Sequence, residues 1–233
     1  MAKSQIIKDL ANGQSSLKVA LKRAKVLMSS LKDKRALNWI DSELIGYGPC
    51  DQLPDYRLER GMLTGSYFKG SMAAHMKWTN VSIPLGTMPK DEQDQLLTVE
   101  FREGVESLQA MLSTANQDRS LIGKQIPADL FPYIAHCNND PYMIISAAQV
   151  QLNPSCFQHI LDCVENKLLD TLLILEDAFG NLDDLDISLV NMDAQASNKI
   201  VEQIIFNIYD NHSITVGEKT NIKDSILQQR SDC

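Results

Sequence analysis

The sequence predicts an α+β protein that is mainly helical: an antiparallel helical bundle with a small inserted antiparallel β-sheet and a short β-rich C-terminal tail. Apolar residues recur at helical spacing over residues 15–44 and 154–179. Between these segments, residues 50–88 carry repeated glycines and lose the helical period, which is typical of short strands and turns. Apolar residues separated by Asn, Asp, Ser and Gly over residues 204–227 predict the tail.

The N-terminal segment is predicted to form three helices joined by two short loops. The first helix covers residues 4–11. A serine precedes the second helix and can cap it, because a serine oxygen accepts a main-chain N–H that has no partner within the helix. The leucine spacing of this second helix ends at Leu31, and Asp33 can cap a third helix that reaches Leu44. Short connections between consecutive helices favour antiparallel packing.

The middle of the chain is predicted to combine strands with one helix and one long loop. The expected strands are residues 57–68, 72–83 and 142–152. A mixed apolar stripe predicts a helix over residues 91–113. Prolines within residues 118–141 predict a loop there, since proline interrupts regular hydrogen bonding.

Residues 154–179 carry the strongest helical period in the chain, and a helix with so much apolar surface must bury one face. We therefore expect one domain over residues 1–179, an acidic linker over residues 180–200 and a β-like tail over residues 201–233. Roughly 20 residues of strand cannot bury a core alone. The tail is thus expected to dock on its own domain, to form oligomers or to stay flexible.

The composition indicates a cytoplasmic protein with no membrane segment. No apolar run in the 233 residues approaches the roughly 18 residues that a membrane helix requires. The N-terminus lacks the apolar region of a secretion signal. The five cysteines are odd in number, widely spaced and without a C-x-x-C pair, which favours a reducing compartment over a disulfide framework.

The net charge of −8 is unevenly distributed, since residues 1–35 contain nine Lys or Arg against two acids. Four of these basic residues lie at helical spacing on one face, and they form the lysine stripe: Lys18, Lys22, Lys25 and Lys32. The lysine stripe is a candidate anion-binding surface for phosphates or for an acidic protein. The alternative, a solvated helix face opposite the leucines, stays open.

The sequence contains no complete catalytic or metal-binding motif. Cys156, His159 and Cys163 share one face of a predicted helix, but zinc sites usually draw paired ligands from a tight turn. A packed core face is the favoured interpretation, and we predict no metal and no cofactor. No G-x-S-x-G nucleophile motif occurs either. Enzymatic activity therefore stays undecided, and the absence of a complete catalytic motif argues against it.

Several stretches, taken together, resemble the AbiTii domain of bacterial abortive-infection proteins. The matching pieces are residues 15–31, 37–47, 53–57, 99–105 and 160–170. Each piece is weakly specific, whereas their order and spacing agree over residues 3–178. Members of this family typically carry a variable C-terminal extension, which residues 180–233 resemble.

The resemblance implies a role in anti-phage defence, in which infected cells stop growing or die, and it assigns no catalytic residue. The polar positions within the matching pieces are Glu43, Tyr47, Tyr56, Arg57, Arg102 and Glu103. Chemically, Arg57 can pair with Glu43 or Glu103 and tie the sheet to the helices as a structural ion pair. A binding surface and a catalytic cluster are the alternatives for these residues.

The leading functional hypothesis is a binding module that senses a phage component or joins a defence-system subunit, with homo-oligomers formed through the tail. A second hypothesis is an enzymatic toxin, such as a nuclease or a nucleotide-modifying effector, although a nuclease needs acidic metal ligands that the sequence does not group. A third is nucleic-acid binding through the lysine stripe, which predicts steep salt dependence.

Overall fold

The structure is a computed structural model. It describes residues 3–31, 33–71, 74–118, 122–187 and 194–209. The chain divides into two compact parts. The helical unit comprises Met1–Gln52 and Glu165–Cys233, and the sheet unit comprises Leu53–Val164. This division differs from the single domain expected over residues 1–179, because the chain after Val164 packs with the N-terminal helices.

The helical unit contains α1 (Gln5–Ala11), α2 (Leu17–Leu31), α3 (Lys34–Ile45), the C-terminal part of α7 (Ser155–Phe179) and α8 (Ala194–Tyr209). Each helix buries one apolar stripe. Fully buried members of these stripes include Leu21, Met28, Ile40, Leu168, Leu172, Leu175 and Ile204. Asp33 caps α3, since its carboxylate accepts hydrogen bonds from the main-chain N–H groups of Arg35 and Ala36.

The first turn of α1 is held by a carboxylate from α7. The main-chain N–H of Ser4 donates to Glu176 Oε1 at 2.6 Å, and the Ser4 hydroxyl donates to the same oxygen at 2.5 Å. Lys3 Nζ lies 2.7 Å from the other carboxylate oxygen. Ser4 is completely buried and its hydroxyl also accepts from the N–H of Leu182. A negative charge at a helix N-terminus is favourable, because the first N–H groups of the helix have no partners within it.

The sheet unit is built on two antiparallel sheets. A short pair joins β1 (Leu58–Arg60) to β4 (Thr98–Glu100). The larger sheet has the order β3-β2-β6-β5, formed by β3 (Met76–Ser82), β2 (Met62–Lys69), β6 (Ile144–Leu152) and β5 (Ile122–Gln125). The helices of the sheet unit are α4 (Lys90–Leu97), α5 (Val105–Asp118), α6 (Phe131–Cys137) and the N-terminal part of α7, with 3₁₀ turns at Asp55–Arg57 and Ala128–Leu130.

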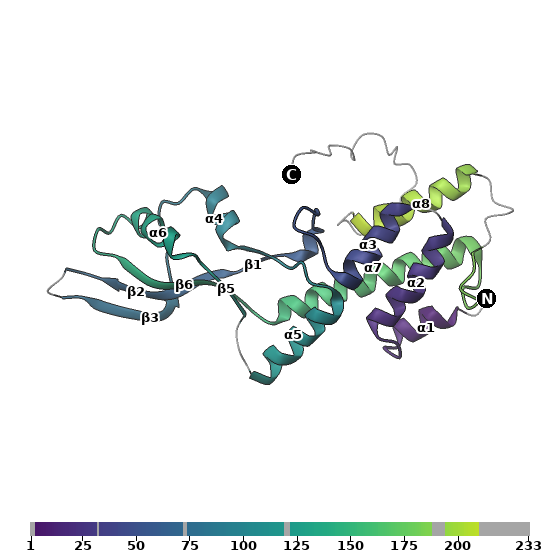
Figure 1. Ribbon diagram of the computed structural model, residues 1–233, viewed down its shortest axis with the longest axis horizontal. Helices are drawn as coiled ribbons and strands as arrows, with labels where there is room; N and C mark the ends of the chain where they lie inside the picture. The colour runs from purple at the N-terminus through teal and green to yellow at the C-terminus, as the bar shows by residue number, and fades with distance from the viewer. Residues whose placement is uncertain (1–2, 32, 72–73, 119–121, 188–193, 210–233) are drawn as a thin grey trace. The chain divides into compact units, whose positions relative to one another are not determined.

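One face of the four-stranded sheet packs on α4 and α6, which lie on the same side of it (Figure 1). The shared core includes Leu63 of β2, Val150 of β6, Leu97 of α4 and Ile134 of α6. The strands β2 and β6 approach closely at Gly65, where an added Cβ would lie 2.0 Å from the Ala147 carbonyl oxygen. Any larger residue at this position would force the two strands apart.

The predicted fold class is confirmed, since the described chain is mainly helical with small antiparallel sheets. The helices expected over residues 4–11, up to Leu31 and over residues 154–179 are present within one or two residues of their predicted ends. The strand expected over residues 142–152 is β6.

Two predictions for the middle of the chain are wrong. The single helix expected over residues 91–113 is interrupted by β4, because residues 98–100 pair with β1 instead of continuing α4. The loop expected over residues 118–141 contains β5 and α6. Its prolines are compatible with both elements, since one lies in the first turn of α6, where no N–H is needed.

The β-like character predicted for the tail is wrong for residues 201–209, and the expected linker is helical from Ala194, because both belong to α8. The apolar residues Val201, Ile204, Ile205 and Ile208 follow helical spacing, and all four are buried. Isoleucine has a high strand propensity, but burial of one apolar face decides the structure here. The rest of the predicted tail, residues 210–233, lies outside the described residues.

Glu176→Gln is expected to lower the stability of the protein at neutral pH, and this loss should shrink in acid. Burial alone would raise the pKa of Glu176, but hydrogen bonds from Lys3 and Ser4 outweigh it and lower the pKa from 4.5 to about 2. The contribution of the carboxylate is therefore complete above its unfolded pKa and is lost as the pH falls toward the folded value. Urea denaturation should show a loss of about 1–3 kcal/mol in the free energy of unfolding near neutral pH.

The matched control is Asp177→Asn. Asp177 follows Glu176 on α7 and also lies near Lys3, but its side chain is largely exposed. This variant should change the free energy of unfolding by less than about 0.5 kcal/mol. A stability difference between wild type and Glu176→Gln that stays constant between pH 7 and pH 3 would contradict this account of the α1 cap.

Candidate functional site

Two of the six polar residues singled out from the sequence meet in the helical unit. Glu43 lies on α3 and is fully buried, and the Tyr47 hydroxyl donates a hydrogen bond to Glu43 Oε1 at 2.7 Å. Burial of a carboxylate is unfavourable unless it receives hydrogen bonds. The tyrosine provides one such bond just beyond the end of α3.

The buried arginine of the sheet unit binds main-chain carbonyl groups. Arg57 ends the 3₁₀ turn after Pro54, and its side chain is completely buried beside the buried Tyr56. Its Nη1 donates to the carbonyl oxygen of Phe101 at 3.3 Å and to that of Glu103 at 2.5 Å. The main-chain N–H of Phe101 donates back to the Arg57 carbonyl oxygen at 2.9 Å. Arg57 therefore fixes the chain that follows β4.

Arg57 contacts Glu103 through the main-chain carbonyl oxygen and not through the ion pair that was predicted, and the Glu103 side chain is exposed. A pairing of Arg57 with Glu43, which would join the two units, stays a prediction. Arg102 lies at the surface, where its Nε and Nη2 contact Glu100 Oε2 at 3.0 and 2.8 Å. The described contacts of Arg57 fit the structural interpretation of this arginine.

The lysine stripe is partly occupied by contacts within the helical unit. Lys22 and Lys25 are exposed on α2, whereas Lys18 is half-buried. Lys25 forms an ion pair with Asp41 of α3. Lys32 lies outside the described residues. The contact with Asp41 reduces the charge that the lysine stripe presents to an outside anion, and anion binding there stays a prediction.

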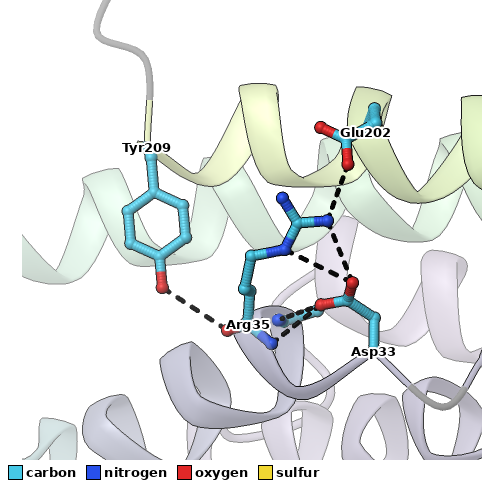
Figure 2. Close-up of polar contacts among 5 residues, drawn as sticks. Asp33, Arg35, Glu202 and Tyr209 are labelled. Atoms are coloured by element: carbon cyan, nitrogen blue, oxygen red, sulfur yellow. Dashed lines mark hydrogen bonds and ion pairs between the residues drawn. The ribbon is translucent and has the colours of Figure 1, made fainter. Parts of the chain in front are cut away.

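A charged junction that sequence reasoning missed holds α8 against α3 (Figure 2). Arg35 Nη2 contacts Asp33 Oδ2 at 3.0 Å and Glu202 Oε1 at 2.7 Å, so one guanidinium bridges the cap of α3 and a carboxylate of α8. The Tyr209 hydroxyl donates to the Arg35 carbonyl oxygen at 3.4 Å. Partial burial of the Tyr209 ring raises the pKa of its hydroxyl.

The pKa of Asp33 reflects opposing effects at the same junction. Burial alone would raise it, but the hydrogen bonds from the Arg35 side chain and main chain dominate and lower it. Asn207 completes the attachment of α8, since its Nδ2 donates to the Lys167 carbonyl oxygen and to the Thr171 hydroxyl, both at 3.0 Å. The only sequence signal for this junction was Asp33, which was recognised as a cap.

A cavity of about 450 Å³ in the sheet unit brings together a thiol, an imidazole and a carboxylate. Its lining includes Cys156, His159 and Glu59. Burial, with the negative charge of Glu59, raises the pKa of Cys156 to about 11. A nucleophilic cysteine needs a lowered pKa, so this cavity does not favour thiol chemistry. Among the described residues, no group of three His, Cys, Asp or Glu side chains is arranged to hold a metal ion.

The paired strands β2 and β3, residues 62–69 and 76–82 and called here the β2–β3 hairpin, present large apolar side chains to solvent. Trp78 is 42% exposed and Met76 is 61% exposed, and nearly the whole of the edge strand β3 is exposed. The Trp78 ring stacks on the Tyr67 ring, with centroids 6.3 Å apart and planes 16° apart. Tyr67 in turn packs against the core under the sheet. Sequence reasoning missed this surface, because only the strand register places these side chains together.

Among the residues that the structure describes, no helix has both the length and the apolar character needed to cross a membrane.

Arg57→Met is expected to destabilise the protein by about 2–4 kcal/mol, because it removes hydrogen bonds from buried carbonyl groups that have lost contact with water. Arg102→Met is the matched control, with an expected change below about 1 kcal/mol, since Arg102 is half-buried and pairs with the exposed Glu100 side chain, and ion pairs open to solvent contribute little. Thermal and urea denaturation of both purified variants provide the measurement. Equal stabilities of the two variants would show that Arg57 has no structural role.

No curated protein and no solved structure matches the chain. The family model AbiTii matches residues 4–202, which include most of both units and the first part of α8. The chain therefore belongs to the AbiTii family, which places it among abortive-infection proteins of anti-phage defence.

Proposed function

We propose that this protein acts in abortive infection as a binding module that senses a phage component or joins another defence subunit. In this proposal the β2–β3 hairpin is the contact surface. The observation that supports it is the exposure of Trp78 and Met76 on an edge strand. An edge strand presents main-chain groups without partners in the sheet, and exposed apolar side chains gathered on such a strand mark an interaction site.

The hairpin also has the rigidity that a binding surface needs. Trp78 rests on Tyr67, and Tyr67 packs against the buried core of the sheet unit. Tryptophan frequently dominates binding energy at interfaces. A ring that is already held in place loses little conformational freedom when a partner covers it. By contrast, the buried Arg57 is engaged with main-chain carbonyls and is not presented outward.

The proposal places the protein in the cytoplasm, where phage components are made, and the widely spaced cysteines favour such a reducing compartment. Self-association is a further part of the proposal. Apolar residues continue through the sequence beyond Tyr209, at Ile214, Val216 and Ile222, and they are the candidates for contact between copies.

The hairpin double variant Met76→Ser/Trp78→Ser is expected to abolish protection of cells against phage while the protein still folds. The physical reason is loss of the exposed apolar anchors with little change to the core. Survival of infected cultures and the number of plaques provide the measurement, with thermal denaturation to verify the fold.

The matched control is Val19→Ser/Val26→Ser, because these two residues of α2 are 48% and 49% exposed and lie in the helical unit. This control should protect like the wild type. Full protection by the hairpin variant would refute the proposed contact surface.

The chain ending at Tyr209 should be monomeric, and the full chain should form larger species. Light scattering after size exclusion measures both masses. Truncation at this point keeps α8 and its contacts with Arg35 and Lys167, so the helical unit retains its described packing. Identical masses for the two chains would remove self-association through residues 210–233 from the proposal.

A further inference from the structure

The β2–β3 hairpin lies in a stretch of the chain without acidic residues. Between Glu59 and Asp91 the sequence contains no Asp or Glu, whereas Arg60, Lys69, Lys77 and Lys90 supply four positive charges. The chain as a whole carries a net charge of −8. In the four-stranded sheet as described, the charged side chains within strands are all lysines: Lys69, Lys77 and Lys124. The sheet therefore favours a negatively charged partner.

Aromatic rings alternate with the cations on this hairpin. On one face, the stacked rings of Tyr67 and Trp78 lie next to Lys69, because the register pairs Tyr67 with Trp78 and Lys69 with Met76. On the other face, Lys77 Nζ lies over the Phe68 ring, 5.8 Å from its centroid. Rings interleaved with lysines are the arrangement that binds single-stranded nucleic acid, in which bases stack on the rings and phosphates contact the cations.

Hydrogen-bonding groups cover the face of the sheet that α4 and α6 leave open. Its residues are identified by the register of β2 with β6 and of β5 with β6, and they include Ser66, Gln149, Gln151 and Gln125. Gln125 Nε2 donates to Gln149 Oε1 at 3.1 Å. This is the face of Phe68 and Lys77, opposite to that of Tyr67 and Trp78. Amides and hydroxyls both donate and accept, so they can bond to the edges of unpaired bases on the Lys77 side of the edge strand.

From this arrangement we infer that the β2–β3 hairpin binds single-stranded nucleic acid that passes over the edge strand β3, with a base stacked on Trp78 and a phosphate held by Lys69 on one face and a phosphate held by Lys77 on the other. The inference rests on the proposed function and names the chemical class of its partner. A duplex fits less well, because its bases already stack on one another and cannot cover an exposed ring. Lys69 also lies 3.4 Å from Asp140, and its exposed ammonium group can contact a phosphate from the solvent side while it keeps this ion pair.

The two tryptophans allow a direct test with the full chain. Trp39 is buried in the helical unit, so quenching of tryptophan emission on binding reports Trp78. The probes are labelled single strands of RNA and DNA of mixed sequence, the duplex of the same sequence, and vesicles of phosphatidylglycerol. Single strands should bind best and quench the emission. Trp78→Ala should weaken binding roughly tenfold or more, and Trp78→Phe should retain most of it.

Salt dependence tests the cations. Lys69→Gln/Lys77→Gln should reduce the slope of log affinity against log salt by about 1.4, since each phosphate contact to a single strand contributes about 0.7. Lys22→Gln/Lys25→Gln, from the lysine stripe, is the matched control and should leave the slope unchanged. Both double variants exchange exposed lysines, and thermal denaturation verifies that each one folds.

Four results would overturn the inference: no binding of any single strand, equal or tighter binding of the duplex, binding of the vesicles alone, or loss of binding only in the lysine-stripe variant. These failures are distinguishable from failure of the proposed function. If the hairpin variant loses protection against phage while no nucleic acid binds, the hairpin remains the contact surface and its partner is of another class.

Discussion

The other helices of the helical unit pack around α7, so burial of the apolar face of α7 is the interaction on which this unit depends. Its 25 residues form one helix that begins in the sheet unit and ends in the helical unit. Within the helical unit it buries Leu168, Leu172 and Leu175 completely. Full burial of such side chains contributes about 1.5–3 kcal/mol each. In the sheet unit the same helix places Phe157 edge-on against Phe101, with centroids 5.3 Å apart.

The same helix also anchors its neighbours by polar contacts. Glu176 accepts the hydrogen bonds that begin α1, and the Lys167 carbonyl with the Thr171 hydroxyl receives the Asn207 amide of α8. Apolar burial supplies most of the stabilisation of these helices but is not directional. The polar contacts are directional, so they fix the register at which α1 and α8 lie along α7.

Much of this fold could be predicted from the sequence, because long helices bury continuous stripes that leave a clear period. Residues 154–179 and Asp33 are examples, since the stripe and the cap both depend on local sequence alone. The interruption at residues 98–100 depends instead on pairing with β1, which lies far away in the sequence. Helix α8 was not predicted, because isoleucine favours strands locally. The helical spacing of these isoleucines stabilises a helix only when α3 and α7 are there to bury them.

The candidate site was predicted less completely. The sequence predicted a structural role for Arg57. It did not predict that its partners are main-chain carbonyl groups, because main-chain oxygens leave no signature in the sequence. The hairpin surface was missed for a different reason. Its rings and lysines are spread over residues 67–78, and only the register of β2 with β3 places Tyr67 against Trp78 and Phe68 beside Lys77. The absence of acids over the same stretch was visible in the sequence, but it indicated a partner only once the register placed these rings and lysines on the two faces of one hairpin at the edge of the sheet.

The account rests on the claim that the partner of this protein contacts the outward side chains of the hairpin during infection. Site-specific photocrosslinking tests it most directly, with a photoreactive residue at position 76 or 78 in living cells and matched probes at positions 19 and 26 of α2. We predict that infection yields crosslinked species from the hairpin positions and none from α2. Crosslinks of equal yield at both places, or none at the hairpin, would contradict the account.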